Sequence, residues 1–262
     1  SMGVAFDDAD LQKAFKRLDE AGSDKPKFVY VKQNFDILAI TAGSAGLSKK
    51  VLGDSSSNYS ASGQTHTGGE YSYKIRYQNT FTTKASNLVF YDSLENYTTP
   101  EGKTSDWHGT LTGVGVNQMT EKGVSPAVYI STVENLDLNA HHDLSDTSVW
   151  TKADSTTDFS SAKAVAVDAR NTDDGSSYVL QPGESLTAYL YMKAPETDVA
   201  QVSSGYPYAY NNVYAGSTLA DGSSSSDYFI HQDYSKIYYV VAGDLNMKKV
   251  NANNTDEPIS GI

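Results

Sequence analysis

Residues 73–77 read Tyr73-Lys74-Ile75-Arg76-Tyr77, in which large apolar side chains alternate with charged ones. Successive side chains of a β-strand point to opposite faces, so this stretch predicts a half-buried strand with Tyr and Ile inward. Similar short runs rich in Val, Ile, Tyr and Thr recur from Lys27 onward, separated by clusters of Gly, Ser, Asn and Asp. Many short strands at this spacing predict an all-β protein, an antiparallel β-sandwich.

The remaining strand candidates share this texture, and a turn signal at residues 181–184, with Pro second and Gly third, separates two of them. The candidates are Phe28–Val31, Leu47–Leu52, Tyr71–Asn79, Asn87–Leu94, Ala127–Thr132, Lys163–Ala169, Ser185–Met192, Tyr208–Ala215 and Ile237–Val241.

One short N-terminal helix is expected before the strands. Asp7 or Asp8 can cap it, Gly22 can end it, and an apolar stripe recurs at helical spacing. The stripe consists of Leu11, Phe15 and Leu18. The helix is expected to pack on the flank of the domain, and a partner-binding helix is the alternative.

Composition excludes several classes of function. The chain has 262 residues, a formal net charge of −12 and no cysteine. Such an acidic chain repels phosphate backbones, which argues against nucleic-acid binding, and disulfides and thiolate metal sites are impossible. No apolar run is long enough to insert into a membrane, and no signal peptide is visible. Nucleophile-elbow, phosphate-loop and zinc-protease motifs are absent, so we expect neither an enzyme with turnover nor a cofactor.

Two polar or aromatic features remain as candidate binding sites. The stretch Glu134–Asp158 is an insertion or a long loop, and it contains His141-His142-Asp143, the nearest approach to a metal cluster. Adjacent histidines bind one ion only on an irregular loop, so no metal site is expected there. Trp107-His108 and Tyr206-Pro207-Tyr208 could stack on a sugar ring, although aromatic residues of a sandwich are more often core or cross-strand pairs.

The end of the chain resembles the opening of a collagen-adhesin B-type repeat, a module found in strings on Gram-positive surface proteins and pilins. The resemblance rests on Leu245–Asn251, which reads as an apolar-x-Lys-Val strand, and on Asp256–Gly261, which reads as the following turn. It implies that residues 244–262 begin a neighbouring repeat. Lys249 would then be that repeat's cross-linking lysine, and we expect it to be unreacted and the end after about Val250 to be mobile.

A longer part of the chain is similar to the immunoglobulin-like stalk domains of bacterial adhesins, of the collagen-adhesin A type. The segments that carry the resemblance are Leu47–Val51, Gly69–Ile75, Asn79-Thr80, Leu88–Leu94 and Tyr210–Val213. It implies an immunoglobulin-like sandwich over residues 46–243, preceded by a segment 1–45 with the helix and a leading strand. An insertion near 95–160 departs from the compact family pattern.

In many of these relatives a lysine on the first strand, an asparagine on the last and an acid between them form an internal isopeptide bond. Period-two alternation places Lys49, Asp92 and Asn211 among apolar neighbours on the inner faces of their strands. A one-residue slip would substitute Lys50 and Asn212, the next-best pair. The alternatives are a buried Lys49–Asp92 ion pair with Asn211 ending a strand, or a lysine in solvent.

Buried charges are costly unless they are paired or neutralised, and isopeptide formation gives these residues a reason to be buried. Burial lowers the pKa of an amine and raises that of a carboxylic acid, so that both can be neutral together. Asp92 would then polarise the Asn211 carboxamide and shuttle protons while the Lys49 amine attacks and ammonia leaves.

These features predict a structural domain of a bacterial cell-surface or pilus-like protein, extracellular and anchored to a Gram-positive cell wall. Its expected partners are neighbouring repeats of the same polypeptide. The alternative is an adhesin module whose 134–158 region or exposed tyrosines recognise host glycan or matrix protein.

Overall fold

The structure, a computed structural model, describes residues 46–258 apart from 201, 204, 221–224, 232–233, 242–249 and 252–253. The expected N-terminal helix, the Phe28–Val31 strand and Lys249 lie outside the described residues. The described residues belong to one compact unit, Ile40–Ile262.

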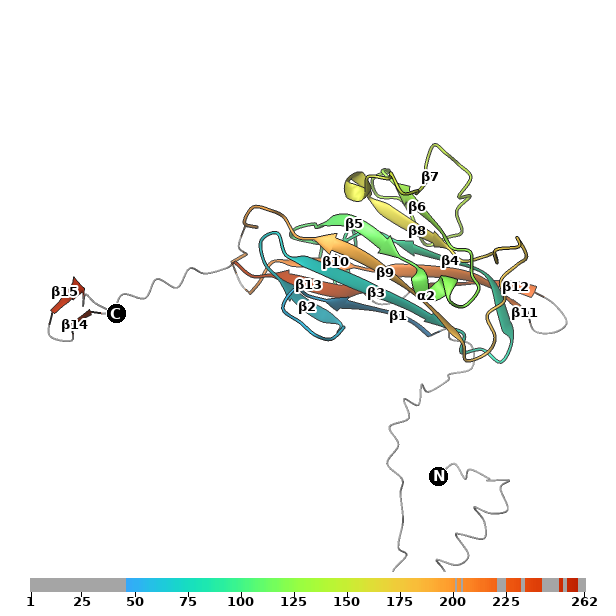
Figure 1. Ribbon diagram of the computed structural model, residues 1–262, viewed down its shortest axis with the longest axis horizontal. Coiled ribbons are helices and arrows are strands. Elements are labelled where there is room, and N and C mark those ends of the chain that lie inside the picture. Colours follow the sequence, from blue (N-terminus) through green and yellow to red (C-terminus); the bar gives the residue numbers. More distant parts are fainter. Residues whose placement is uncertain are drawn as a thin grey trace, which may run out of the picture. The chain divides into compact units, whose positions relative to one another are not determined.

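Antiparallel sheets dominate the described chain, which confirms the predicted all-β sandwich (Figure 1). The first sheet has four strands in the order β1-β3-β9-β5, which are β1 (Gly46–Leu52), β3 (Glu70–Gln78), β9 (Ser185–Lys193) and β5 (Thr110–Gly115). The alternation predicted for residues 73–77 is present in β3, where Tyr73, Ile75 and Tyr77 are buried and Lys74 and Arg76 are partly exposed.

The second sheet has six strands in the order β12-β11-β4-β8-β6-β7. These are β12 (Ser225–His231), β11 (Val213–Ala220), β4 (Lys84–Asp92), β8 (Ala164–Asp168), β6 (Ala127–Ser131) and β7 (Thr151–Lys152). A third sheet, β10-β13-β2, contains β10 (Tyr208–Asn211), β13 (Ser235–Tyr239) and β2 (Ser62–Thr65), with β13 and β2 parallel. A four-residue helix α2 (Asn117–Thr120) and a 3-10 turn η1 (Phe159–Ser161) complete this part of the chain.

The expected strand Tyr208–Ala215 is two strands. Asn212 interrupts it: β10 pairs with β13, whereas β11 pairs with β4, starting with Val213 opposite Asp92. The chain thereby passes from the small sheet to the six-stranded sheet at this residue. This break lies between Asn211 and the strand that aligns with Asp92, and it therefore shapes the candidate site.

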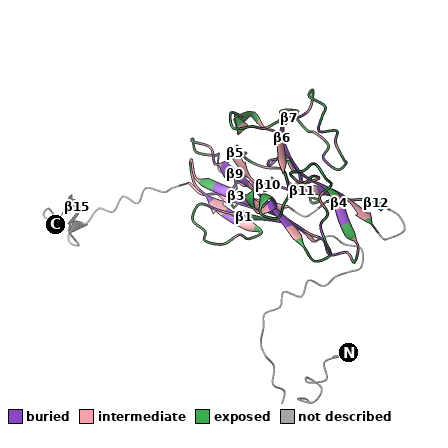
Figure 2. Ribbon diagram, turned by 45° about the vertical axis from the view of Figure 1, so that its right-hand side comes forward, coloured by how far each residue is buried: buried purple, intermediate pink, exposed green. Residues whose placement is uncertain are grey.

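The main core lies between the inner faces of these sheets. One cluster joins residues of β1, β3 and β9 with residues of β4, β8, β11 and β13. Figure 2 shows the buried residues along the strands and the exposed ones mainly in the connecting loops. The turn predicted at 181–184 is confirmed, since Glu184 N donates to Gln181 O and Gly183 has φ 83°.

The segment 134–158 does not stand away from the sandwich as an open loop. Its residues Leu138, Leu144 and Trp150 pack on Val89 and Tyr91 of β4 and form a second core cluster on the outer face of that sheet. The insertion is also shorter than the expected range near 95–160. Strands β5 and β6 lie within that range, yet they belong to the two main sheets. Both faces of β4 and β8 are therefore covered.

The end of the described chain forms a two-stranded antiparallel pair, β14 (Val250–Asn251) and β15 (Asn254–Pro258). The pairing includes Val250 itself, and the expected mobility of the end after about Val250 stays a prediction.

Candidate functional site

Lys49 lies in the middle of β1 and points into the core. It pairs with Ile75 of β3, its neighbours Leu47 and Val51 are buried on the same face, and its side chain is 0% exposed. Lys50 is exposed on the opposite face. The alternation of β1 therefore selects Lys49 over its neighbour as the buried amine.

Asp92 ends β4 and meets this lysine. Its carboxylate is buried, with Oδ2 accepting a hydrogen bond from Lys49 Nζ and Oδ1 accepting one from Leu94 N at 3.0 Å. Leu94 and Glu95 both have positive φ, 46° and 71°, so the chain turns sharply after the strand. The turn and the hydrogen bond to Leu94 hold the carboxylate toward Lys49.

Asn211 is the last residue of β10 and is fully buried. The same lysine amine that contacts Asp92 also donates to the backbone oxygen of Asn212, at 3.2 Å. The structure thus brings the amine against the Asp92 carboxylate and against the residue next to Asn211.

The two asparagines differ in how their carboxamides are satisfied. Asn212 Oδ1 accepts a hydrogen bond from Ser93 Oγ at 2.6 Å. Asn211 Oδ1 and Nδ2 are both buried, and neither has a hydrogen-bond partner among the described residues. Burying an unpaired amide is costly, so Asn211 is a polar group in an apolar core without compensation.

Burial makes the Lys49 amine easier to deprotonate. Burial lowers the pKa of the Lys49 amine, while the charge and hydrogen bond of Asp92 and the charge of Glu95 oppose this shift in part. The Tyr73 ring lies 4.7 Å from Lys49 Nζ and covers the amine. A neutral amine is the form that can act as a nucleophile.

Sequence reasoning missed Glu95, a second acid in the same core. It is 0% exposed and accepts hydrogen bonds from Tyr71 OH, Tyr73 OH and Gly109 N at 2.6–2.7 Å. Burial raises the pKa of this carboxyl group, and these three hydrogen bonds partly offset the increase. Because one of its partners is Tyr73, Glu95 fixes the ring that covers Lys49. The signal available in the sequence was the pair of inward tyrosines, which need an acceptor when buried.

The other candidate sites are dispersed. Trp107 is buried and donates to Pro207 O, so it is a core residue, whereas Tyr206 is 50% exposed.

His142, from the candidate metal cluster, uses its backbone N–H to bond Tyr91 OH and its ring to bond Asp137 O. In the part of the chain that the structure describes, no group of three His, Asp or Glu side chains is placed to hold a metal ion. No helix of these residues has the length and apolar character needed to cross a membrane.

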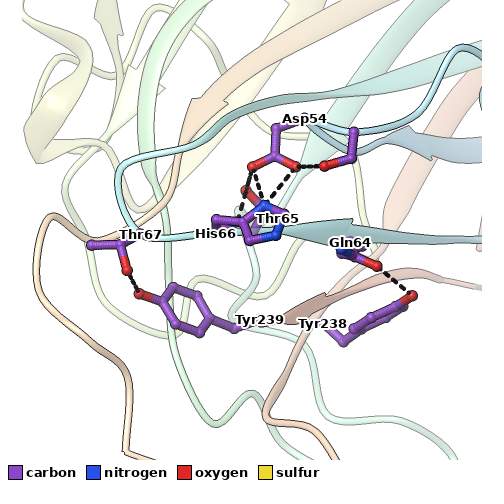
Figure 3. Close-up of polar contacts among 8 residues, drawn as sticks. Asp54, Gln64, Thr65, His66, Thr67, Tyr238 and Tyr239 are labelled. Carbon is purple, nitrogen blue, oxygen red and sulfur yellow. Dashed lines mark hydrogen bonds and ion pairs between the residues drawn. The ribbon is translucent and has the colours of Figure 1, made fainter. Parts of the chain in front are cut away.

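A polar cluster beside β2 fixes the strand that pairs with β13 (Figure 3). Asp54 accepts hydrogen bonds from Ser55 Oγ, Thr65 Oγ1 and His66 N, and its carboxylate contacts His66 Nδ1 at 3.0 Å. Tyr238 OH donates to Gln64 Oε1 in the same view. The loop before β2 is thereby joined to β2, and β2 to β13.

We expect the stabilisation from Asp54 to disappear in acid. Burial raises the pKa of Asp54, but the hydrogen bonds from His66 and Ser55 outweigh it and hold the pKa below the ordinary 3.8. A carboxyl group whose pKa is lowered by folding stabilises the fold above its unfolded pKa and loses this effect as the pH falls through its folded pKa. Asp54→Asn should therefore lower the free energy of unfolding by about 1–2 kcal/mol at pH 7. Urea titrations of both proteins should show this gap closing below pH 3.8; a gap that widens in acid would contradict the assignment.

No protein family matches the chain by sequence, and no curated protein does. Among solved structures, the chain is similar to a Corynebacterium diphtheriae protein whose name describes it as membrane-anchored, with 10% identity and a TM-score of 0.35 over 84% of this chain and 39% of that one. It thus spans about two-fifths of that protein.

Two further solved structures are similar over 77% of this chain. One is AggA, the major subunit of aggregative adherence fimbriae type I from Escherichia coli, with 11% identity, a TM-score of 0.29 and 97% of that chain covered. The other is AvmM, which catalyses macrocyclization in alchivemycin A biosynthesis, with 13% identity, a TM-score of 0.26 and 92% covered. Likeness at this level assigns no family, so the functional argument rests on the buried site.

Proposed function

We propose that this chain is a structural domain of a bacterial surface or pilus-like protein, braced by an isopeptide bond between Lys49 and Asn211. The observation that carries the proposal is the buried contact of Lys49 with Asp92 beside the Asn211 residue, whose carboxamide has no partner among the described residues. A buried amine, a buried acid and an unpaired carboxamide in one core are the reactants and the proton carrier of amide exchange.

The chemistry follows from these groups. Lys49 transfers its extra proton to Asp92, and the neutral amine attacks Cγ of Asn211. Asp92 donates this proton to Nδ2 and accepts one from Nζ, so that the C–N bond to Nδ2 breaks and ammonia is released. Asp92 then gives its remaining proton to the ammonia, which departs as ammonium. The product is a secondary amide between Lys49 and Asn211, and Asp92 ends in its starting state. Fixed placement of the reactants can supply roughly 7–11 kcal/mol of the barrier.

The reaction occurs once per chain, so the domain is not an enzyme with turnover. The bond would join β1, the first described strand, to the end of β10, across roughly 160 residues of a chain without cysteine. It cannot be reduced as a disulfide can, which suits a stalk outside the cell. Together with the resemblance to Gram-positive adhesin stalks, this supports a cell-wall-anchored surface protein whose neighbours are repeats of the same polypeptide.

Peptide mapping tests the bond directly. Trypsin digestion of the purified chain, followed by tandem mass spectrometry, should yield one branched peptide that joins the Lys49 segment to the Asn211 segment with the loss of one ammonia. A branched peptide joining Lys49 to Asp92 with the loss of one water would identify Asp92 as the acyl partner and contradict the proposed pair. Separate, unmodified peptides would contradict the bond itself.

A second candidate function, glycan recognition, is favoured by one surface. The tyrosine cluster, defined as Tyr206, Tyr208 and Tyr238, has ring centroids of neighbouring members 5.0 and 5.9 Å apart, and Lys236 Nζ lies 4.7 Å above the Tyr208 ring. Aromatic faces flanked by polar groups are suited to sugar rings.

A glycan array separates the two functions. If this surface binds glycan, Tyr206→Ala should abolish the array signal of the intact chain. The control is Tyr191→Ala, which removes another exposed tyrosine outside the cluster and should leave the signal unchanged. A wild-type chain that binds nothing on the array would contradict glycan recognition, and the structural role would be the one remaining function.

A further inference from the structure

Unpaired polar groups in the described core gather on one cross-strand pair. Four buried side-chain polar atoms of the described residues have no hydrogen-bond partner. Three of them are Oδ1 and Nδ2 of Asn211 and Oγ of Ser235, and the fourth is Nε1 of Trp150. Buried unpaired groups are rare in folded proteins, so three on a single pair require an explanation.

Asn211 and Ser235 lie directly opposite each other in the β10–β13 ladder. Directly opposed residues of an antiparallel pair point to the same face, with Cβ atoms about 4.5–5.5 Å apart. The next pair on this face is Ala209 and Ile237, and both residues belong to the main core. Ser235 therefore faces the same interior as Asn211, and its side chain is 0% exposed.

This interior also contains the lysine. The main core includes Leu47 and Val51, which flank Lys49 on β1, and strand β13 approaches β1. The hydroxyl of Ser235 thus has no partner among the described residues. It lies across the ladder from the Asn211 carboxamide and faces the interior that contains the Lys49 amine.

We propose that Ser235 is the oxyanion donor of the cross-linking reaction, a role that rests on the proposed function. When Lys49 Nζ attacks Cγ of Asn211, the C=O double bond opens and negative charge develops on Oδ1. Ser235 Oγ–H donates a hydrogen bond to this oxygen and gives up no proton. After ammonia leaves, the same hydroxyl donates to the oxygen of the new amide. Asn211 thereby exchanges an unpaired carbonyl for a paired one.

Three other polar side chains of the described core, those of Ser93, Asp92 and Ser217, already have hydrogen-bond partners. The nearby Ser93 hydroxyl is committed to Asn212 Oδ1, and Asp92 is committed to Lys49 and to Leu94 N. The Ser217 hydroxyl, another fully buried serine of the sandwich, contacts Tyr77 OH at 3.2 Å. Ser235 alone among these groups has a donor without a partner in the described chain. The β2 strand and its Asp54 cluster hold β13, which carries Ser235, in register.

The test compares Ser235→Thr with Ser235→Val, because threonine keeps the hydroxyl and valine replaces it with a methyl group of similar size. Both side chains suit a strand, so a difference between the variants reports the hydroxyl rather than packing. Full-length chains are made by cell-free synthesis, quenched in acidic denaturant at successive times, and analysed by intact mass for the loss of ammonia. Ser217→Ala is the control for the loss of a buried serine elsewhere.

The expected result is a rate of ammonia loss in Ser235→Thr within several-fold of wild type, and a rate in Ser235→Val that is about 10²–10³ lower, as for the loss of one oxyanion donor. Ser217→Ala should react at the wild-type rate. Equal rates in the Thr and Val variants would overturn the role of Ser235 while leaving the cross-link in place. A wild-type chain that never loses ammonia would overturn the cross-link and the role of Ser235 together.

Discussion

Replacement of Asn211 by alanine is expected to lower the free energy of unfolding by about 5 kcal/mol, because the variant loses a covalent closure of roughly 160 residues. For a domain of this size the midpoint of thermal unfolding should fall by about 10–20 °C. The Lys49–Asp92 contact remains in this variant, so the change isolates the bond from the ion pair. Circular dichroism recorded during heating measures this midpoint for the variant and for the wild-type chain.

The neighbouring residues provide matched controls for this prediction. Lys50→Ala removes an exposed lysine from the same strand, and Asn212→Ala removes the adjacent carboxamide, which is bonded to Ser93. Both variants should still form the bond and unfold within a few degrees of wild type. If Asn212→Ala destabilised the chain as much as Asn211→Ala and also prevented ammonia loss, the assignment of the acyl residue would be wrong.

Replacement of Asp92 by alanine should be more damaging still. The variant loses the proton carrier, so no bond forms, and the buried Lys49 amine also loses its counter-charge. Removal of one partner from a buried pair costs about 3–5 kcal/mol. Asp92→Ala should therefore unfold at a lower temperature than Asn211→Ala, although both chains lack the bond.

The double variant Lys49→Met/Asp92→Ala tests the reason for this difference. It has no buried Lys49 amine to desolvate, so its stability should return to the level of Asn211→Ala or above. The stability of Asp92→Ala should also rise as the pH increases toward 10.5, because burial lowers the pKa of Lys49 and the folded chain then binds fewer protons than the unfolded one. A double variant no more stable than Asp92→Ala would contradict the account of the buried amine.

Local alternation was enough to predict the inner faces that carry the site. Lys49 and Asp92 occupy strands with apolar neighbours at every second position, and both are buried as expected. Alternation also favoured Lys49 over Lys50, and the register of β1 against β3 agrees with this choice, since a slip of one residue would have reversed every side chain. Neither strand sequence specifies that register by itself.

Other features depended on contacts between distant segments. Strand β2 reads Ser62-Gly63-Gln64-Thr65, which has no apolar pattern, and it forms through its parallel pairing with β13. The interruption at Asn212 arises because β10 and β11 join different sheets. Glu95 looked like the start of a loop, and only the fold places it beneath Tyr71 and Tyr73.

The polar, irregular sequence of segment 134–158 predicts an insertion or a long loop. Its few large apolar residues, Leu138, Leu144 and Trp150, are the ones that cover β4. A sign of this was present in β4 itself, where Val89 and Tyr91 are apolar on the face opposite Leu88 and Phe90. Strands buried on both faces lose the simple alternation, which predicts a cover on the second face.

The central claim is that Lys49 and Asn211 are joined in the folded chain, and an accurate intact mass of the purified, denatured protein tests it most directly. The wild-type chain should be lighter than its sequence by one ammonia, whereas Lys49→Ala, Asn211→Ala and Asp92→Ala should each have their full calculated mass. A wild-type chain at its full calculated mass would contradict the cross-link and leave the β-sandwich without it.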